Sequence, residues 1–154
     1  MKTAGPGLLA GCKILTIEGY TSIADLKPGA RVVTRSGLKR LRHLNKTTRF
    51  FKPVAVTSGS LGYTRPARNL KMAPDQEVMV RDWRAEVLFG RDAVVIPVSR
   101  LLDGKYIFSQ GEAAHHDVYE LVFDIEEVFY ADGVELLSKH PTATSKEDHL
   151  TEAA

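Results

Sequence analysis

Short apolar runs recur along this chain, and glycine, proline or an Asp-Gly pair stands between them. The segments Lys13–Ile17 and Val134–Leu137 are rich in residues that favour extended backbone, and Asp132-Gly133 is a typical hairpin turn. The 12 glycines and 7 prolines supply many further turns. Short strands at such close spacing predict an all-β domain, with brief helical turns at Thr21–Leu26 and Ser99–Leu102.

The order of segments predicts one domain between two irregular ends. Residues 1–10 are expected to be a flexible lead-in, because Gly5-Pro6-Gly7 disfavours regular structure. Residues 142–154 are expected to be a polar tail, and residues 11–141 the domain with its single core. The predicted strands are Lys13–Ile17, Arg31–Arg35, a long twisted pair within Leu38–Phe51, Pro53–Thr57, Glu77–Arg81, Glu86–Phe89, Ala93–Val98, Tyr106–Ser109, Val118–Asp124, Glu127–Ala131 and Val134–Leu137.

The composition excludes several classes of protein. Hydrophobic residues make up 44% and charged residues 26% of the 154 residues, which is typical of a globular chain rather than a disordered one. The formal net charge of +2 is too small to indicate a nucleic-acid partner, and no apolar run is long enough to span a bilayer. Cys12 is the only cysteine, which excludes an internal disulfide. The sequence predicts no cofactor and no metal site. It leaves open the oligomeric state and the compartment, whether cytoplasmic as expressed or part of a secreted or surface parent protein.

A cluster of basic residues follows Ser36-Gly37. It consists of Lys39, Arg40, Arg42, His43, Lys46, Arg49 and Lys52. Such a cluster suits either a phosphate-binding patch or the solvated face of a long strand pair. The near balance of charge and the lack of an aromatic stacking series favour the strand pair, so a nucleic-acid partner is not expected.

Two stretches of the chain share one plan. Residues 24–33 and 99–108 each run from a short polar-apolar turn, through a glycine and a two-residue spacer, into an apolar strand. This echo is consistent with two similar β halves. Because the match is brief, chance resemblance is the alternative.

A longer series of motifs resembles a known family. The series is Gly11-Cys12, Ile23–Thr34, Pro53-Val54, Gly59–Gly62, Pro66–Leu70, Ala73-Pro74, Val95–Val98, Leu101–Gly104, Val118–Leu121, Ala131–Gly133 and Ser138. In order and spacing it resembles bacterial Hint (hedgehog/intein) domains over residues 11–141. The resemblance implies a flat, Hint-like all-β fold with two halves related by a pseudo-two-fold axis and one or two short helical turns.

The resemblance also implies autoprocessing, with the chain's own polypeptide as the substrate. In the family, the thiolate of the leading cysteine attacks the carbonyl of the preceding residue, and the amide becomes a thioester that a second nucleophile resolves. Here Cys12 would attack the Gly11 carbonyl, an N-to-S acyl shift that leads to self-cleavage at this junction. Gly11 suits this role because a residue without Cβ allows close approach. Cys12 is alternatively a buried small side chain.

The residues that would assist this reaction as general acids or bases differ from the family pattern. The family's histidine after a Ser-Pro turn aligns with Gln76, and two further histidines align with Glu120 and Glu126. An amide donates hydrogen bonds but cannot act as a general acid near neutral pH, and general acid–base help is worth about 10²–10⁴ in rate. Asp75 would orient a donor or act as a weak base near Cys12, or it simply forms the turn after the proline.

The pair His115-His116 is a further candidate for catalysis or metal binding. It precedes the strand predicted at Val118. Adjacent residues on a strand point to opposite faces, so at most one of the two could face a given site. Positions in a surface loop are the alternative interpretation.

Three functions remain open from the sequence. The first is a degenerate Hint-like domain, kept as a binding or structural module, in which the acyl shift is slow or lost. The second is an active, cysteine-dependent domain of the self-cleaving or protein-splicing type. The third is a module that binds through its basic segment. The replaced histidines favour the first, so autocatalytic peptide-bond cleavage is expected to be impaired.

Overall fold

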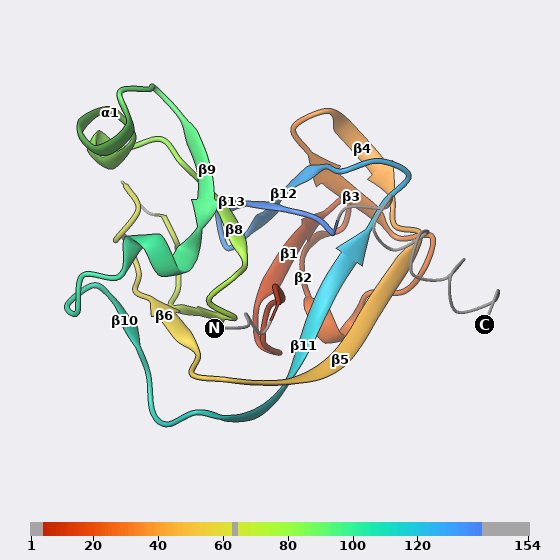
Figure 1. Cartoon of the computed structure of the whole chain (residues 1–154). Coiled ribbons are helices and arrows are strands. Elements are labelled where there is room, and N and C mark those ends of the chain that lie inside the picture. Colours follow the sequence, from red (N-terminus) through yellow and green to blue (C-terminus); the bar gives the residue numbers. More distant parts are fainter. Residues whose placement is uncertain (1–4, 63–64, 140–154) are drawn as a thin grey trace, which may run out of the picture.

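The computed structural model of the chain describes residues 5–62 and 65–139. Its strands are β1 (Lys13–Thr16), β2 (Gly19–Ser22), β3 (Arg31–Thr34), β4 (Gly37–Arg40), β5 (His43–Phe51), β6 (Val54–Val56), β7 (Leu70–Met72), β8 (Glu77–Val80), β9 (Val94–Pro97), β10 (Ile107–Ser109), β11 (Ala114–Val122), β12 (Val128–Ala131) and β13 (Val134–Leu137). The helical elements are α1 (Trp83–Phe89) and the 3-10 turns η1 (Ile23–Asp25) and η2 (Val98–Leu101). The domain is therefore built mainly of strands, as the sequence predicts (Figure 1).

The described strands pair antiparallel throughout. The largest sheet has 8 strands, in the order β2-β1-β3-β12-β13-β8-β9, with β4 paired to β3. In the described part of the chain, β10, β6 and β7 form a three-stranded sheet, while β11 and β5 form a long ribbon. The hairpin β12–β13 lies at the centre of the large sheet and turns at Asp132-Gly133, where Asp132 takes a φ of 48°. This left-handed conformation is the one that a tight hairpin turn requires.

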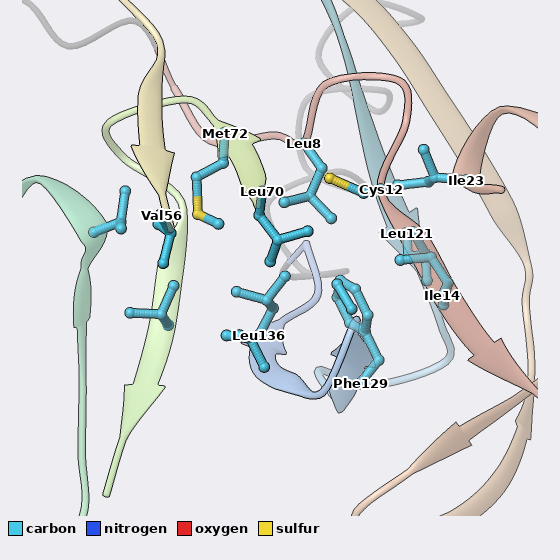
Figure 2. Packing of buried hydrophobic residues seen from close by; sticks show 14 of the residues in the cluster. Leu8, Cys12, Ile14, Ile23, Val56, Leu70, Met72, Leu121, Phe129 and Leu136 are labelled. Carbon is cyan, nitrogen blue, oxygen red and sulfur yellow. The ribbon is translucent and has the colours of Figure 1, made fainter. Parts of the chain in front are cut away.

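The core lies where the sheets face one another. The large sheet contributes Ile14, Phe129 and Leu136, and the three-stranded sheet contributes Leu70 and Met72. Figure 2 shows these side chains directed toward one another. Because alternate residues of a strand point to opposite faces, each short strand supplies only one or two core residues, and several strands are needed to enclose one core.

Most predicted strands lie within two residues of an observed strand, but β2 and β7 were not predicted and β11 begins four residues before Val118. One segment also differs in type. Glu86–Phe89, which its composition predicts to be a strand, belongs instead to helix α1. The helix begins after Asp82, whose Oδ1 accepts a hydrogen bond from the Arg84 amide at 3.0 Å, and it ends at Gly90 in the left-handed conformation. These two cap residues favour a helix more strongly than the β-type side chains between them favour a strand.

Residues 5–10, expected to be part of a flexible lead-in, are held in the fold. Leu8 is buried, and its amide and carbonyl exchange hydrogen bonds with those of Tyr119 at 3.0 and 2.8 Å. The amide of Leu9 donates to the Lys71 carbonyl at 3.2 Å. Burial of a leucine in the core offsets the disorder that the neighbouring Gly-Pro-Gly favours. Residues 1–4 of the lead-in, and the tail predicted over 142–154, lie outside the described residues.

The two stretches that share a plan in the sequence also share local structure. The turn η1 precedes β3, and the turn η2 precedes β10. Each turn leads to a glycine with positive φ, Gly29 at 95° and Gly104 at 75°. The repeat fits a fold built from two related halves. None of the helices in the described ranges is long and apolar enough to cross a membrane.

Candidate functional site

Cys12 lies immediately before β1, where the chain enters the core. Its side chain is 3% exposed, and its sulfur points toward Leu8 among apolar neighbours (Figure 2). The thiol donates to the carbonyl oxygen of Lys71, 3.7 Å from Sγ. Within residues 5–62 and 65–139, no side chain forms a hydrogen bond with this sulfur. The thiol is thus surrounded as a core side chain would be.

The protonation of Cys12 reflects this burial. Removal from water raises the pKa of the thiol from 9.0 to about 12. The carboxylate of Asp132 adds to the rise in pKa, and the guanidinium of Arg68 opposes it. At neutral pH such a thiol is protonated, whereas the thiolate is the nucleophilic form.

The Gly11 carbonyl has a cationic partner that the sequence did not indicate. Arg68 Nη2 donates to this oxygen at 3.1 Å. The guanidinium is held by the buried carboxylate of Asp132, with Nε–Oδ1 and Nη2–Oδ2 distances of 3.0 and 3.2 Å. Asp132 also accepts from the amide of Lys13 at 3.3 Å, so the β12–β13 turn positions both Arg68 and the start of β1. Arg68 and Asp132 both lie within motifs of the family resemblance, but the sequence alone does not show that their side chains are in contact.

Gln76 lies in the turn between β7 and β8 and is buried. Its Oε1 accepts a hydrogen bond from the amide of Gly7 at 3.1 Å. Its Nε2 donates to the carbonyls of Glu77 and Leu137, at 3.1 and 3.0 Å. Both ends of the side-chain amide therefore bind backbone groups, and Gln76 links the start of the described chain to β13.

A pocket of about 590 Å³ opens beside this turn. The three positions at which the family resemblance leads us to expect histidines all line it: Gln76, Glu120 and Glu126. The carboxylate of Glu120 is 4% exposed, and its Oε1 lies 3.1 Å from Arg49 Nη2 and 3.7 Å from Lys139 Nζ. Two cations thus compensate the buried charge. The three positions that the resemblance assigns to one site thus line one pocket in the structure.

The four predicted site residues form two separate groups. Asp75 stands with Gln76 on the pocket wall, where its Oδ2 accepts a hydrogen bond from the amide of Gly5 at 2.7 Å. Gly11 and Cys12 are absent from the walls of this pocket. Hydrogen bonds of the described residues do not join the Gly11-Cys12 pair to Asp75 or Gln76. Within the described residues, Cys12 thus shares neither a hydrogen bond nor this pocket wall with Asp75 or Gln76.

The histidine pair lies within a strand rather than in a surface loop. His115 and His116 belong to β11, opposite Phe50 and Arg49 of β5. The ring of His115 lies 5.0 Å from that of Phe50, and the ring of His116 lies 5.0 Å from that of Phe51. Both rings thus pack against aromatic neighbours. In the part of the chain that the structure describes, no three His, Cys, Asp or Glu side chains are grouped to hold a metal ion.

The basic segment occupies β4 and β5, where acidic side chains face some of its cations. Arg42 Nε lies 3.2 Å from Asp124 Oδ1, and Lys46 Nζ lies 3.8 Å from Asp117 Oδ2. Exposed pairs of this kind contribute little stability, but they reduce the local positive potential. These ion pairs favour a solvated strand face over a phosphate-binding patch. The predicted pair within Leu38–Phe51 is wrong, however, because β4 pairs with β3 and β5 pairs with β11.

Solved structures with a similar fold are inteins and an intein-like domain. The gp41-1 intein aligns with a TM-score of 0.55 at 13% identity, over 88% of this chain and 99% of that chain. A variant of the MchDnaB-1 intein aligns with a TM-score of 0.53 at 13% identity, over 88% of this chain and 100% of that chain. The bacterial intein-like domain from Clostridium thermocellum aligns with a TM-score of 0.52 at 16% identity, over 86% and 98% of the two chains. At this level of identity the likeness defines the fold alone.

The sequence profile of the Hint domain matches residues 6–143. No curated protein matches the chain. The chain belongs to the Hint domain family, which comprises domains of the autoprocessing and splicing type. The predicted all-β, Hint-like fold is thus confirmed. The match begins upstream of Gly11, in the segment that the structure packs against Gln76.

Proposed function

We propose that this protein is a Hint domain in which the acyl shift at Gly11-Cys12 is lost or strongly slowed, and that the scaffold serves as a binding or structural module. The observation that carries the proposal is the environment of Cys12. A nucleophilic thiol needs a base or a cation that favours the thiolate. Cys12 instead is buried, donates to a backbone carbonyl and has a pKa raised to about 12.

The hydrogen bonds of Gln76 support the same proposal. In the family resemblance, the group at this position assists the departing amide nitrogen. Here Gln76 Oε1 accepts a hydrogen bond from the backbone amide of Gly7. The residue that carries this amide is a glycine, which has no nucleophilic side chain. A Cβ at Gly7 would lie 2.6 Å from the Cβ of Val118, so another side chain at this position would require the backbone to move.

Two deficits act on one chemical step. The thiolate of Cys12 is scarce at neutral pH, and Gln76 cannot deliver a proton to a leaving amide. Because attack and departure belong to the same acyl shift, the two losses multiply rather than add. The proposal therefore predicts a stable Gly11-Cys12 bond, with the fold intact.

The test is a fusion of a small folded protein to the N-terminus of the full chain. The fusion is incubated with dithiothreitol, which would resolve a thioester, and its mass is followed for several days. We expect a single intact mass at neutral pH. Release of a fragment that ends at Gly11, seen with the native chain and absent from Cys12→Ala, would overturn the proposal.

A Gln76→His variant of the same fusion separates chemistry from geometry. Since the side chain at position 76 meets the amide of Gly7 rather than the Gly11-Cys12 junction, we expect this variant to stay intact as well. Thiol-dependent cleavage at Cys12 in the variant would show that only the proton donor was missing.

An active self-cleaving domain is the second candidate, and one contact favours it. Arg68 Nη2 lies 3.1 Å from the Gly11 carbonyl oxygen, where a cation would stabilise the negative charge that develops during attack. If the fusion is cleaved, Arg68→Ala should slow the cleavage about 10²–10³-fold, the usual effect of losing one such donor. Arg65→Ala is the matched control, because it removes a nearby exposed arginine.

A further inference from the structure

The pocket beside Gln76 already holds one ligand, which is the chain's own backbone. Gly5 and Pro6 form part of its wall. The amide of Gly5 donates to Asp75 Oδ2 at 2.7 Å, and the amide of Gly7 donates to Gln76 Oε1 at 3.1 Å. Pro6 stands between the two amides and has no N–H of its own, so the two acceptors satisfy both donors of this tripeptide.

The pocket leaves no room for a side chain at the first of these positions. A Cβ at Gly5 would lie 2.4 Å from Arg49 Nη1 and 2.7 Å from Arg49 Cζ. The guanidinium of Arg49 lies 3.1 Å from Glu120 Oε1, a carboxylate that is 4% exposed. The end of an arginine side chain is flexible, but a shift of this one would disturb its ion pair with a buried carboxylate. The contact therefore selects glycine rather than merely tolerating it.

The backbone conformation imposes the same selection at both ends. Gly5 has a φ of 92° and Gly7 a φ of 140°, values that residues with a Cβ rarely adopt. At Gly7 the neighbouring atom is Val118 Cβ, which belongs to the ribbon strand β11 and cannot rotate away. Sterics and backbone conformation thus specify the pattern Gly-X-Gly.

We propose that this pocket is a recognition site for a Gly-X-Gly peptide segment, filled in cis by Gly5-Pro6-Gly7. Asp75 and Gln76 hold the two amides, and Arg49 is the residue that determines specificity for glycine at the first position. The site lies apart from Cys12 and does not depend on whether the acyl shift survives. It gives the positions that replace the family's histidines a binding role in place of a catalytic one.

The experiment is a double-mutant cycle on the full chain, with Gly5→Ala, Arg49→Ala and the double variant. The readout is the protection of the Gly7 amide against hydrogen exchange, measured by NMR, with the core amide of Leu136 as the reference for global stability. We expect Gly5→Ala to lower Gly7 protection about tenfold or more, the effect of losing one hydrogen-bonded docking contact, while Leu136 stays protected. In the double variant, Gly7 protection should recover part of this loss, because the clash is gone while the backbone strain of an alanine at position 5 remains.

The control variant is Gly11→Ala. Gly11 also has a positive φ, 104°, but a Cβ there has no neighbour within 4 Å, so this variant adds backbone strain without a clash. We expect Gly7 protection to be unchanged in Gly11→Ala. Full protection of the Gly7 amide in Gly5→Ala would overturn the proposal. So would a loss of Gly7 protection on Gly5→Ala that is equally large in the native and the Arg49→Ala backgrounds. Neither outcome bears on cleavage at Cys12, which the fusion tests separately.

Discussion

Two side chains define the chemistry of this domain at the scale of single residues. Cys12 is the thiol that the family resemblance makes a nucleophile, and it is buried with a backbone carbonyl as its partner. Gln76, where the resemblance leads us to expect a histidine, uses both ends of its amide group to hold backbone. A residue that is satisfied in this way stabilises the fold, and it is poorly placed to exchange protons or to attack a carbonyl.

The first prediction concerns Gln76. Replacement by leucine keeps the approximate volume but leaves the amide of Gly7 and the carbonyl of Leu137 without this partner. Each unsatisfied buried group costs about 1–3 kcal/mol, so Gln76→Leu should lower the free energy of unfolding by about 2–4 kcal/mol. Urea denaturation measures this change. Gln110→Leu, at an exposed position, is the control and should change stability by less than about 0.5 kcal/mol.

The second prediction concerns pH. In the folded protein the pKa of Cys12 is raised from 9.0 to about 12. Between these values the folded state keeps a proton that the unfolded state has lost, so the free energy of unfolding falls as the pH rises through this window. Below the unfolded-state pKa the thiol makes no contribution to the pH dependence. Cys12→Ala should remove this part of the alkaline loss. Parallel urea titrations of the two proteins above pH 9 would reveal it, and identical slopes would contradict it.

At the scale of single residues, the sequence could indicate which side chains belong to a site, but not which groups they form hydrogen bonds with. The alignment of Gln76, Glu120 and Glu126 with one site agrees with the pocket that all three line. The amide that Gln76 meets depends on the path of residues 5–8, and that path is fixed by the burial of Leu8 against distant strands. Local patterns predict a flexible Gly-Pro-Gly there, because contacts across the chain leave no periodic signal.

At the scale of secondary structure, α1 shows how local signals compete. The residues of Glu86–Phe89 favour extended backbone, and the strand predicted there is wrong. The cap residues were readable, since Asp82 precedes the segment and Gly90 follows it. The strands β1, β3 and β8 were predicted well because each buries mainly one face, and burial leaves its period in the sequence. Figure 1 shows α1 at the periphery of the domain, and the chain continues from it into β9.

The third prediction tests this cap. Asp82 accepts a hydrogen bond from the Arg84 amide at 3.0 Å and pairs with the buried Arg84 guanidinium. Asp82→Ala removes both contacts and should lower the free energy of unfolding by at least about 1 kcal/mol, measured by thermal or urea denaturation. Asp92→Ala, in the exposed loop after the helix, is the control and should be close to neutral.

At the scale of the whole molecule, the segment before Cys12 joins separate sheets. Leu8 pairs with Tyr119 of the ribbon strand β11, and Leu9 donates to Lys71 of β7 in the three-stranded sheet. The same segment enters the core through the Leu8 side chain (Figure 2). The fold class could be read from the spacing of strands, but this connecting role could not, since it depends on contacts between distant parts of the chain.

The fourth prediction tests the connecting role. Leu8→Ala leaves a cavity in the shared core and should lower the free energy of unfolding by about 2–5 kcal/mol, measured by urea denaturation. Leu102→Ala is the control, because that side chain is 43% exposed and fills no cavity. A flexible lead-in would predict equally small changes for the two variants.

The most direct test of the account is a titration of the Cys12 thiol in the folded protein. The rate of alkylation by iodoacetamide is followed against pH for the native chain, with Cys12→Ala as the blank. The account predicts very slow alkylation at neutral pH and no titration midpoint below about pH 10, because the buried thiol has a pKa raised to about 12. Rapid alkylation at neutral pH, with a midpoint at or below about 8, would mean an activated thiol and would contradict the account.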